Sequence, residues 1–132
     1  MIVTYAGNGS LTNTFSGDGG QATAAGISNP EGIAYDGKGN TYIADYDNQR
    51  IRVVSATGII NTVFGTGGTC AAGAGNACGD GGPASAATFN NPSAMQFDTA
   101  GNLYIADLAD QRIRKITATN GNITGASIIR CV

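Results

Sequence analysis

The sequence predicts an all-β fold made of repeated four-stranded antiparallel sheets. Residues 30–54 return 62 positions later as residues 92–116, with about half of the residues identical. A repeat period of this length is typical of stacked supersecondary units. Short runs rich in β-branched and aromatic residues alternate with turn-forming residues, as in strands joined by hairpins. The 21 glycines among 132 residues favour turns over helices.

Each repeat contains apolar runs of about five residues that we expect to be strands. In the first unit they are 32–36, 41–45, 50–54 and 59–64. The segments between them are short and rich in Gly, Asn and Asp, as hairpin turns require. Because links this short join antiparallel neighbours, each unit is predicted to be a meander. A single helical turn is expected at most, in the alanines of residues 20–26.

Four-stranded meanders repeated along a chain and joined by a longer loop are the blades of a β-propeller. The residues here resemble the NHL repeat, in its bacterial form that contains Gly-Asp-Gly-Gly. The resemblance lies in PEGIAYD at 30–36, GNTYIAD at 39–45, NQRIR at 48–52, and the linker elements AGNG and SGDGGQA at 6–9 and 16–22. These motifs recur in both units, so the resemblance covers nearly the whole chain.

The resemblance implies two blades, at residues 30–67 and 92–132, joined and preceded by long glycine-rich loops at 10–29 and 68–91. Residues 1–9 match the last strand of a blade and are expected to form an extra N-terminal strand. Two blades do not close a propeller of four to eight, and open blades expose strand edges and apolar faces. We expect closure by a longer chain or by further copies in a homo-oligomer, such as three copies in a six-bladed ring.

Charge and cysteine content limit the partners and the compartment. A net charge of −2 without a basic patch argues against a nucleic-acid partner, and no apolar stretch is long enough to span a membrane. Met1 leads directly into strand-like sequence rather than a signal peptide, which favours a start within a longer protein.

Cys70 and Cys78 bracket an inserted loop and are either free thiols or a disulfide; Cys131 is the odd cysteine. A disulfide would indicate an extracellular or cell-surface location.

Acidic and amide side chains gather in the loops that should share one propeller face. The second and fourth strands of a meander run in the same direction, so the turn and the long loop that follow them lie at the same end. The predicted interaction rim consists of Asp18, Asp47, Asn48, Gln49, Asp80, Asp110 and Gln111. Oxygen ligands of this kind could hold Ca²⁺, but the calcium-loop pattern is absent. We therefore favour structural roles, with Asp45 and Asp107 bonding turn amides and pairing with Arg50 and Arg112.

The sequence argues against catalysis. It contains no histidine, which excludes a Ser-His-Asp system or a histidine-ligated metal. Glu31 is the only glutamate, so a glycosidase carboxylate pair has little support. We expect no cofactor and a non-enzymatic binding or scaffold module that contacts a protein or glycan through its rim loops. The alternatives are a structural subunit of an extracellular assembly or filament, and a fragment of a propeller enzyme whose catalytic residues lie in other blades.

Overall fold

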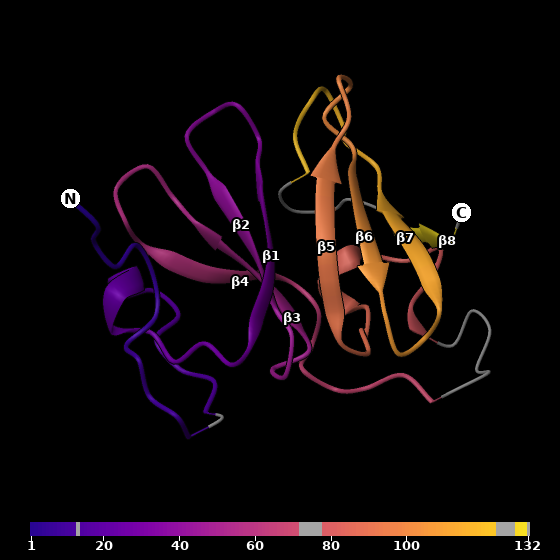
Figure 1. Cartoon of the computed structure of the whole chain (residues 1–132). Helices are drawn as coiled ribbons and strands as arrows, with labels where there is room; N and C mark the ends of the chain where they lie inside the picture. Colours follow the sequence, from indigo (N-terminus) through magenta and orange to yellow (C-terminus); the bar gives the residue numbers. More distant parts are fainter. Residues whose placement is uncertain (13, 72–77, 124–128, 132) are drawn as a thin grey trace.

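The chain folds into two four-stranded antiparallel sheets that stand face to face (Figure 1). The computed structural model describes residues 1–12, 14–71, 78–123 and 129–131. The first sheet, blade 1, contains β1 (Pro30–Tyr35), β2 (Thr41–Asp45), β3 (Arg50–Val54) and β4 (Ile60–Phe64). The second, blade 2, contains β5 (Pro92–Phe97), β6 (Leu103–Asp107), β7 (Arg112–Ile116) and β8 (Ile129–Cys131). The predicted all-β class with incomplete propeller blades is confirmed.

The sequence repeat is also a repeat of strand register. In blade 1, β2 pairs with β3 from Thr41 opposite Val54 to Asp45 opposite Arg50. In blade 2, β6 pairs with β7 from Leu103 opposite Ile116 to Asp107 opposite Arg112. Every pair in the second set lies 62 residues after its counterpart in the first. Equivalent side chains therefore point to equivalent faces of the two blades.

The Gly-Asp-Gly-Gly loops pack against short 3₁₀ turns, which are η1 (Ala22–Ala24) and η3 (Ala84–Ala86). The first glycine of each motif has a positive φ, 90° at Gly17 and 91° at Gly79. A Cβ at Gly17 would also lie 2.7 Å from the Cα of Ala25, and one at Gly79 would lie 2.8 Å from the Cα of Ala87. The motif needs glycine here because both the backbone angle and the close approach exclude a side chain.

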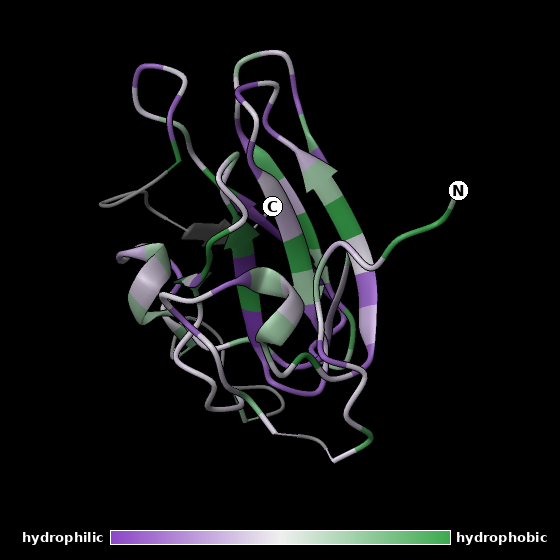
Figure 2. Ribbon diagram, turned by 90° about the vertical axis from the view of Figure 1, so that its left-hand side faces the viewer, coloured by the Kyte–Doolittle hydropathy of each residue, from purple (hydrophilic) through white to green (hydrophobic). Residues whose placement is uncertain are grey.

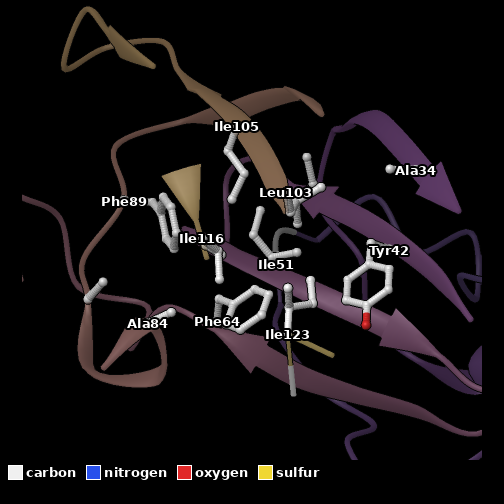
Figure 3. Packing of buried hydrophobic residues seen from close by; sticks show 12 residues of the cluster. Ala34, Tyr42, Ile51, Phe64, Ala84, Phe89, Leu103, Ile105, Ile116 and Ile123 are labelled. Atoms are coloured by element: carbon white, nitrogen blue, oxygen red, sulfur yellow. The ribbon is translucent and has the colours of Figure 1, made fainter. Parts of the chain in front are cut away.

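The main hydrophobic core lies between the two blades (Figure 3). Blade 1 contributes Tyr42, Ile51 and Phe64, and blade 2 contributes Leu103 and Ile105, all essentially buried. A smaller cluster on the other face of blade 1 consists of Ala22, Ala25, Ile43, Val54 and Ile60. The two blades are therefore joined by a continuous apolar layer, and blade 1 has a second apolar face directed away from blade 2.

The expected N-terminal strand requires correction, because residues 1–9 contain no strand. No ladder joins this segment to a described strand, and its backbone instead bonds the η1 loop. The Gly7 amide donates to the Ala22 carbonyl at 2.9 Å, and the Asn8 amide donates to the Ala25 carbonyl at 3.0 Å. Figure 2 views blade 1 from its outer side and shows the hydrophobic start of the chain, in green, leaving the body of the molecule. Within the described residues, no helix has the length and apolarity needed to cross a membrane.

Candidate binding site

The predicted rim residues do share one end of the blades, but a buried ion-pair network uses several of them. In blade 1, Arg52 lies between two carboxylates. Its Nη1 donates to Asp45 Oδ2 at 3.0 Å, and its Nη2 donates to Asp18 Oδ1 at 2.8 Å. The Arg52 and Asp45 side chains are fully buried, whereas the Asp18 side chain is 34% exposed. The network ties the Gly-Asp-Gly-Gly loop to the sheet.

Blade 2 contains the same network. The Arg114 guanidinium donates from Nη1 to Asp107 Oδ2 at 2.8 Å and approaches Asp80 Oδ1 with Nη2 at 2.6 Å. Burial raises the pKa of the Asp107 carboxyl, and this rise is opposed by hydrogen bonds from the Asn90 amide and from Arg114. The other oxygen of Asp107 accepts the Asn90 amide at 2.7 Å. Asp18, Asp45, Asp80 and Asp107 therefore have structural contacts in this network.

The predicted partners of Asp45 and Asp107 need correction. Asp45 lies directly opposite Arg50 across the ladder, but its ion pair is with Arg52, two residues further along the strand. An arginine side chain is longer than the gap to a residue directly opposite, so the diagonal position fits better. Arg50 instead donates to the carbonyls of Asn48 and Thr66, both at 3.1 Å, and its guanidinium lies 3.8 Å from the centre of the Phe15 ring. Arg112 contacts Asp80, at 3.8 Å.

The remaining predicted rim residues differ in their exposure. Asn48 is buried and donates to Asp45 at 2.9 Å. The Gln49 side chain crosses to blade 2 and accepts the Asn91 amide at 2.6 Å. Asp47 accepts the Ser28 hydroxyl at 3.2 Å, and Asp110 accepts the side-chain amide of Asn90 at 3.1 Å. Gln111 is exposed. Much of the predicted rim is thus engaged within the fold.

Cys70 and Cys78 form a disulfide, with their Cα atoms 5.3 Å apart. Residues 72–77, which they enclose, lie outside the described part of the chain. The two sulfur atoms and a carboxylate oxygen of Asp110 lie within 4.8 Å of one another. Both thiols are consumed by the disulfide, so this group of three does not supply the thiolate ligands of a metal site.

A pocket of about 370 Å³ opens between the blades at the end opposite the ion-pair networks. Its walls are the β1–β2 turn, the β5–β6 turn and the turn at residues 119–122. The two hairpin turns share one design, in which an aspartate accepts from the amides two and four residues later. In the first, Asp36 accepts from Lys38 at 2.7 Å and Asn40 at 3.2 Å. In the second, Asp98 accepts from the corresponding amides, both at 2.9 Å.

These contacts keep both pocket carboxylates ionised. Burial raises the pKa of Asp36, but the hydrogen bonds from Asn40 and Lys38 and the Lys38 charge outweigh it, and the pKa is lowered overall. The pKa of Asp98 is also lowered, mainly by the side-chain hydrogen bond from Asn102. Lys38 closes one side of the pocket by donating to the Gly121 carbonyl and to Asn122 Oδ1, both at 2.6 Å.

Tyr42 is the one tyrosine among the described residues that line this pocket. It is 1% exposed and packs edge-on against Phe97, with ring centres 5.1 Å apart. Its hydroxyl has no hydrogen-bond partner among the residues that the structure describes. Burial, followed by the nearby Asp36 charge, raises the pKa of Tyr42 to about 12. The phenol therefore stays protonated at neutral pH and can both donate and accept a hydrogen bond.

Sequence reasoning did not identify this pocket. Its walls come from segments about 60 residues apart, which only the packing of the blades brings together. One signal was present: the spacing Asp36 to Asn40 recurs as Asp98 to Asn102. That pattern marks the two turns but does not indicate that they face each other across a cavity.

Comparisons with known proteins agree with the architecture. A family profile of the teneurin NHL domain matches residues 5–68 and again residues 61–128. No curated protein matches the chain. A solved structure of a Bacteroides thetaiotaomicron protein of unknown function has a TM-score of 0.61 at 26% identity, over 79% of this chain and 24% of that one.

Two further similar structures are auxiliary nutrient binding proteins, from Bacteroides ovatus and Bacteroides thetaiotaomicron. Both have a TM-score of 0.56, at 24% and 22% identity, over 79% of this chain and 26% of theirs. The chain thus spans about a quarter of the length of these neighbours. The repeated motifs, the matching register of both sheets and the two profile matches together establish that this chain belongs to the NHL-repeat family.

Proposed function

We propose that this chain is a non-enzymatic binding module whose inter-blade pocket holds a neutral sugar residue of a glycan. The observation that carries the proposal is the Tyr42 hydroxyl, which belongs to the lining of a polar pocket and makes no hydrogen bond to the described residues. A phenol can both donate and accept a hydrogen bond. This hydroxyl is therefore available to a ligand hydroxyl.

The charges around the pocket favour a neutral ligand rich in hydroxyl groups. Asp36 and Asp98 are ionised, and Lys38 is the one basic side chain among the described residues of the pocket lining. An anionic ligand would meet a net negative lining. Carboxylates accept hydrogen bonds from hydroxyl groups, and the Oδ2 oxygen of each pocket aspartate accepts only one bond, from the Asn40 or the Asn102 side chain, which leaves it a further acceptor site. The volume of about 370 Å³ falls within the range of about 300–1,000 Å³ typical of small-molecule sites.

Binding without turnover fits the chemistry of the pocket. The whole sequence lacks histidine, and the lysine, tyrosine and aspartates of the pocket are held by turn contacts or kept protonated. The relatives described as nutrient binding proteins share the fold at 24% and 22% identity; the ligand class comes from the pocket alone. The Cys70–Cys78 disulfide supports a location in an oxidising compartment, outside the cytosol.

The test is a titration of the ¹⁵N-labelled chain with neutral sugars (glucose, galactose, mannose and N-acetylglucosamine), monitored by amide chemical shifts. Galacturonic acid serves as the charged comparison for galactose. We expect shifts at residues 38–42 and 98–101 with at least one neutral sugar, and weaker binding of the acid. Shifts confined to residues 46–49 and 108–111 would instead favour the rim at the other end of the blades, and no binding of any sugar would overturn the glycan assignment.

Tyr42→Phe tests whether the Tyr42 hydroxyl binds the ligand, and Tyr104→Phe is its matched control. Tyr104 occupies the equivalent position in blade 2 and does not line the pocket. Loss of one hydrogen bond worth about 1 kcal/mol would weaken binding about fivefold in Tyr42→Phe, with no change in Tyr104→Phe. Equal affinities for both variants and the unmodified chain would remove Tyr42 from the site.

A further inference from the structure

The interface between the two blades joins two different faces. We call the face of blade 1 the presenting side and the face of blade 2 the receiving side. Blade 1 presents Tyr42, Ala44 and Ile51, and blade 2 receives them on Leu103 and Ile105 in one buried cluster (Figure 3). One polar contact fixes the position at the rim, where Gln49 Oε1 accepts the Asn91 amide at 2.6 Å.

The receiving side of this interface occurs a second time, on the outer face of blade 1. Four members of the outer cluster, Ala22, Ala25, Ile43 and Val54, lie 62 residues before Ala84, Ala87, Ile105 and Ile116 of the inter-blade cluster and are their repeat counterparts. In blade 2 these residues are covered by blade 1. In blade 1 the partly buried residues packed on them are Ala6 and Ile27. Ile33 and Tyr35 beside them are 61% and 64% exposed.

The outer face of blade 1 is also hollowed. A concavity of about 320 Å³ is lined mostly by apolar side chains, including Tyr5, Ile27, Ile33, Tyr35 and Ile43. In blade 2 the counterparts of Ile33 and Tyr35 are Met95 and Phe97, which pack into the inter-blade core. The hollow therefore corresponds to the place that a neighbouring blade fills within the chain.

The presenting side also occurs a second time, on the outer face of blade 2. Tyr104, Ala106 and Ile113 correspond to Tyr42, Ala44 and Ile51 by the identical ladder register. Ile51 is fully buried between the blades, whereas Ile113 is 49% exposed. The same apolar side chain is thus covered in one blade and uncovered in the other.

The two residues of the Gln49–Asn91 contact also have counterparts at the outer faces, where this contact is not made. Gln111 corresponds to Gln49, and Asn29 corresponds to Asn91. Both glutamines have a φ near 54°, at 55° and 53°, and the two asparagines have φ of 51° and 60°. Within the described chain, no hydrogen bond joins the Gln111 side chain or the Asn29 amide to a side chain. The backbone is therefore set at both ends of the molecule as it is at the internal interface.

We propose that the outer face of blade 1 binds the outer face of blade 2 of a second copy of this chain. The contact repeats the internal interface, with Ile113 of one copy packed on Ile43 of the other and Gln111 Oε1 accepting the Asn29 amide. A head-to-tail contact of this kind joins unlike faces, so copies add until the ring closes or a chain of copies forms.

Three differences make this contact weaker than the internal one. On the presenting side, the residues Gly32, Ala34 and Val53 of blade 1 are replaced in blade 2 by Ala94, Gln96 and Lys115. At the internal interface a Cβ on Gly32 would clash with the Ser93 carbonyl, so Ala94 holds the strands further apart. Association is therefore concentration dependent and exchanges with the monomer.

The first test is sedimentation velocity of the chain over a range of concentrations, in the Cys131→Ser background so that this cysteine forms no intermolecular disulfide. The mass should rise with concentration from that of the 13.2 kDa monomer. Ile113→Asp should abolish the rise because it places a charge in the apolar contact. Leu11→Asp is the control, since Leu11 is 98% exposed and belongs to neither face. A monomer at all concentrations, or assembly unaffected by Ile113→Asp, would overturn the proposal.

A mixing experiment tests the head-to-tail geometry. Ile113→Asp blocks the blade 2 face and leaves blade 1 intact, whereas Ile33→Asp blocks the blade 1 face and leaves blade 2 intact. Each variant alone should stay monomeric, and an equimolar mixture should form a dimer that cannot extend. Dimerisation of Ile113→Asp alone would show that like faces bind each other, which contradicts the proposal. Amide spectra of each variant establish that it is folded.

Discussion

Arg52 and Asp45 form an ion pair at 3.0 Å in which both side chains are fully buried. Arg114 and Asp107 form the same pair at 2.8 Å in the second blade. Each arginine also bonds loop carbonyls: Arg52 donates to Gly26 and Ser16, and Arg114 donates to Thr88 and Cys78. The pair therefore connects strands two and three of a blade to the long loop that precedes it.

Loss of Arg52 should destabilise the protein strongly. Arg52→Met leaves the Asp45 carboxylate buried without its cation, which costs about 3–5 kcal/mol. Arg50→Met is the control on the same strand, because Arg50 lies at the partly exposed rim and bonds two carbonyls; we expect about 1 kcal/mol or less. Urea denaturation followed by circular dichroism measures both. Equal stability of the two variants would contradict a structural role for the buried pair.

The two Gly-Asp-Gly-Gly aspartates should differ in their contribution. The Asp18 side chain is 34% exposed and the Asp80 side chain 5% exposed. Both aspartates form an ion pair with the buried arginine of their blade, and solvent screening weakens the more exposed pair, which is that of Asp18. Asp80→Ala should therefore lower the free energy of unfolding more than Asp18→Ala, measured under identical denaturation conditions. The reverse order would show that exposure does not control the strength of these contacts.

The turn aspartates should make stability depend on acid pH. Hydrogen bonds, chiefly from the Asn102 side chain, lower the folded-state pKa of Asp98 below its ordinary value of 3.8. The stability this provides is present above pH 3.8 and is lost as the pH falls through the lowered folded pKa. In Asn102→Ala we expect the pKa of Asp98 to rise, measured by ¹³C carboxyl titration. Asp36, in the equivalent turn, should be unaffected, and a rise at both aspartates would indicate a global change instead.

Reduction of the Cys70–Cys78 disulfide should lower stability by about 2.5 kcal/mol, the chain-entropy value for a closed loop of this size. The ring also positions the Cys78 carbonyl, which accepts the Thr88 amide at 3.0 Å and Arg114 Nη2 at 3.2 Å. Thermal unfolding with and without reductant measures the effect, with Cys70→Ser/Cys78→Ser as the reference that reductant should not change. A reductant effect that persists in this double variant would point to Cys131.

The strands were predictable because each depends on local sequence. The runs at 41–45 and 50–54 are strands within those bounds, since β-branched residues and short polar turns determine them together. The choice of Arg52 over Arg50 was not predictable from spacing. It depends on the diagonal reach across the ladder and on where the Gly-Asp-Gly-Gly loop folds back, and both are properties of the assembled blade.

The pocket was beyond prediction for a related reason. Tyr42 resembles a core tyrosine in the sequence, and it is one by its burial. Only the packing of the blades shows that its hydroxyl end meets the turns at 98–101 and 119–122 rather than other apolar side chains. The strand predicted at residues 1–9 failed similarly, because a strand needs a neighbour that local sequence does not provide.

The buried charges of each blade are neutralised within the same stretch of chain. Asp18, Asp45 and Arg52 lie in one repeat unit, and Asp80, Asp107 and Arg114 lie in the next. Duplication of the coding segment for one unit therefore adds a blade that already contains its own counter-ions. The contacts that cross from blade to blade join different units, as Gln49 of the first joins Asn91 of the second. A duplicated unit therefore has to match its neighbour only through these contacts, since its buried charges are already paired.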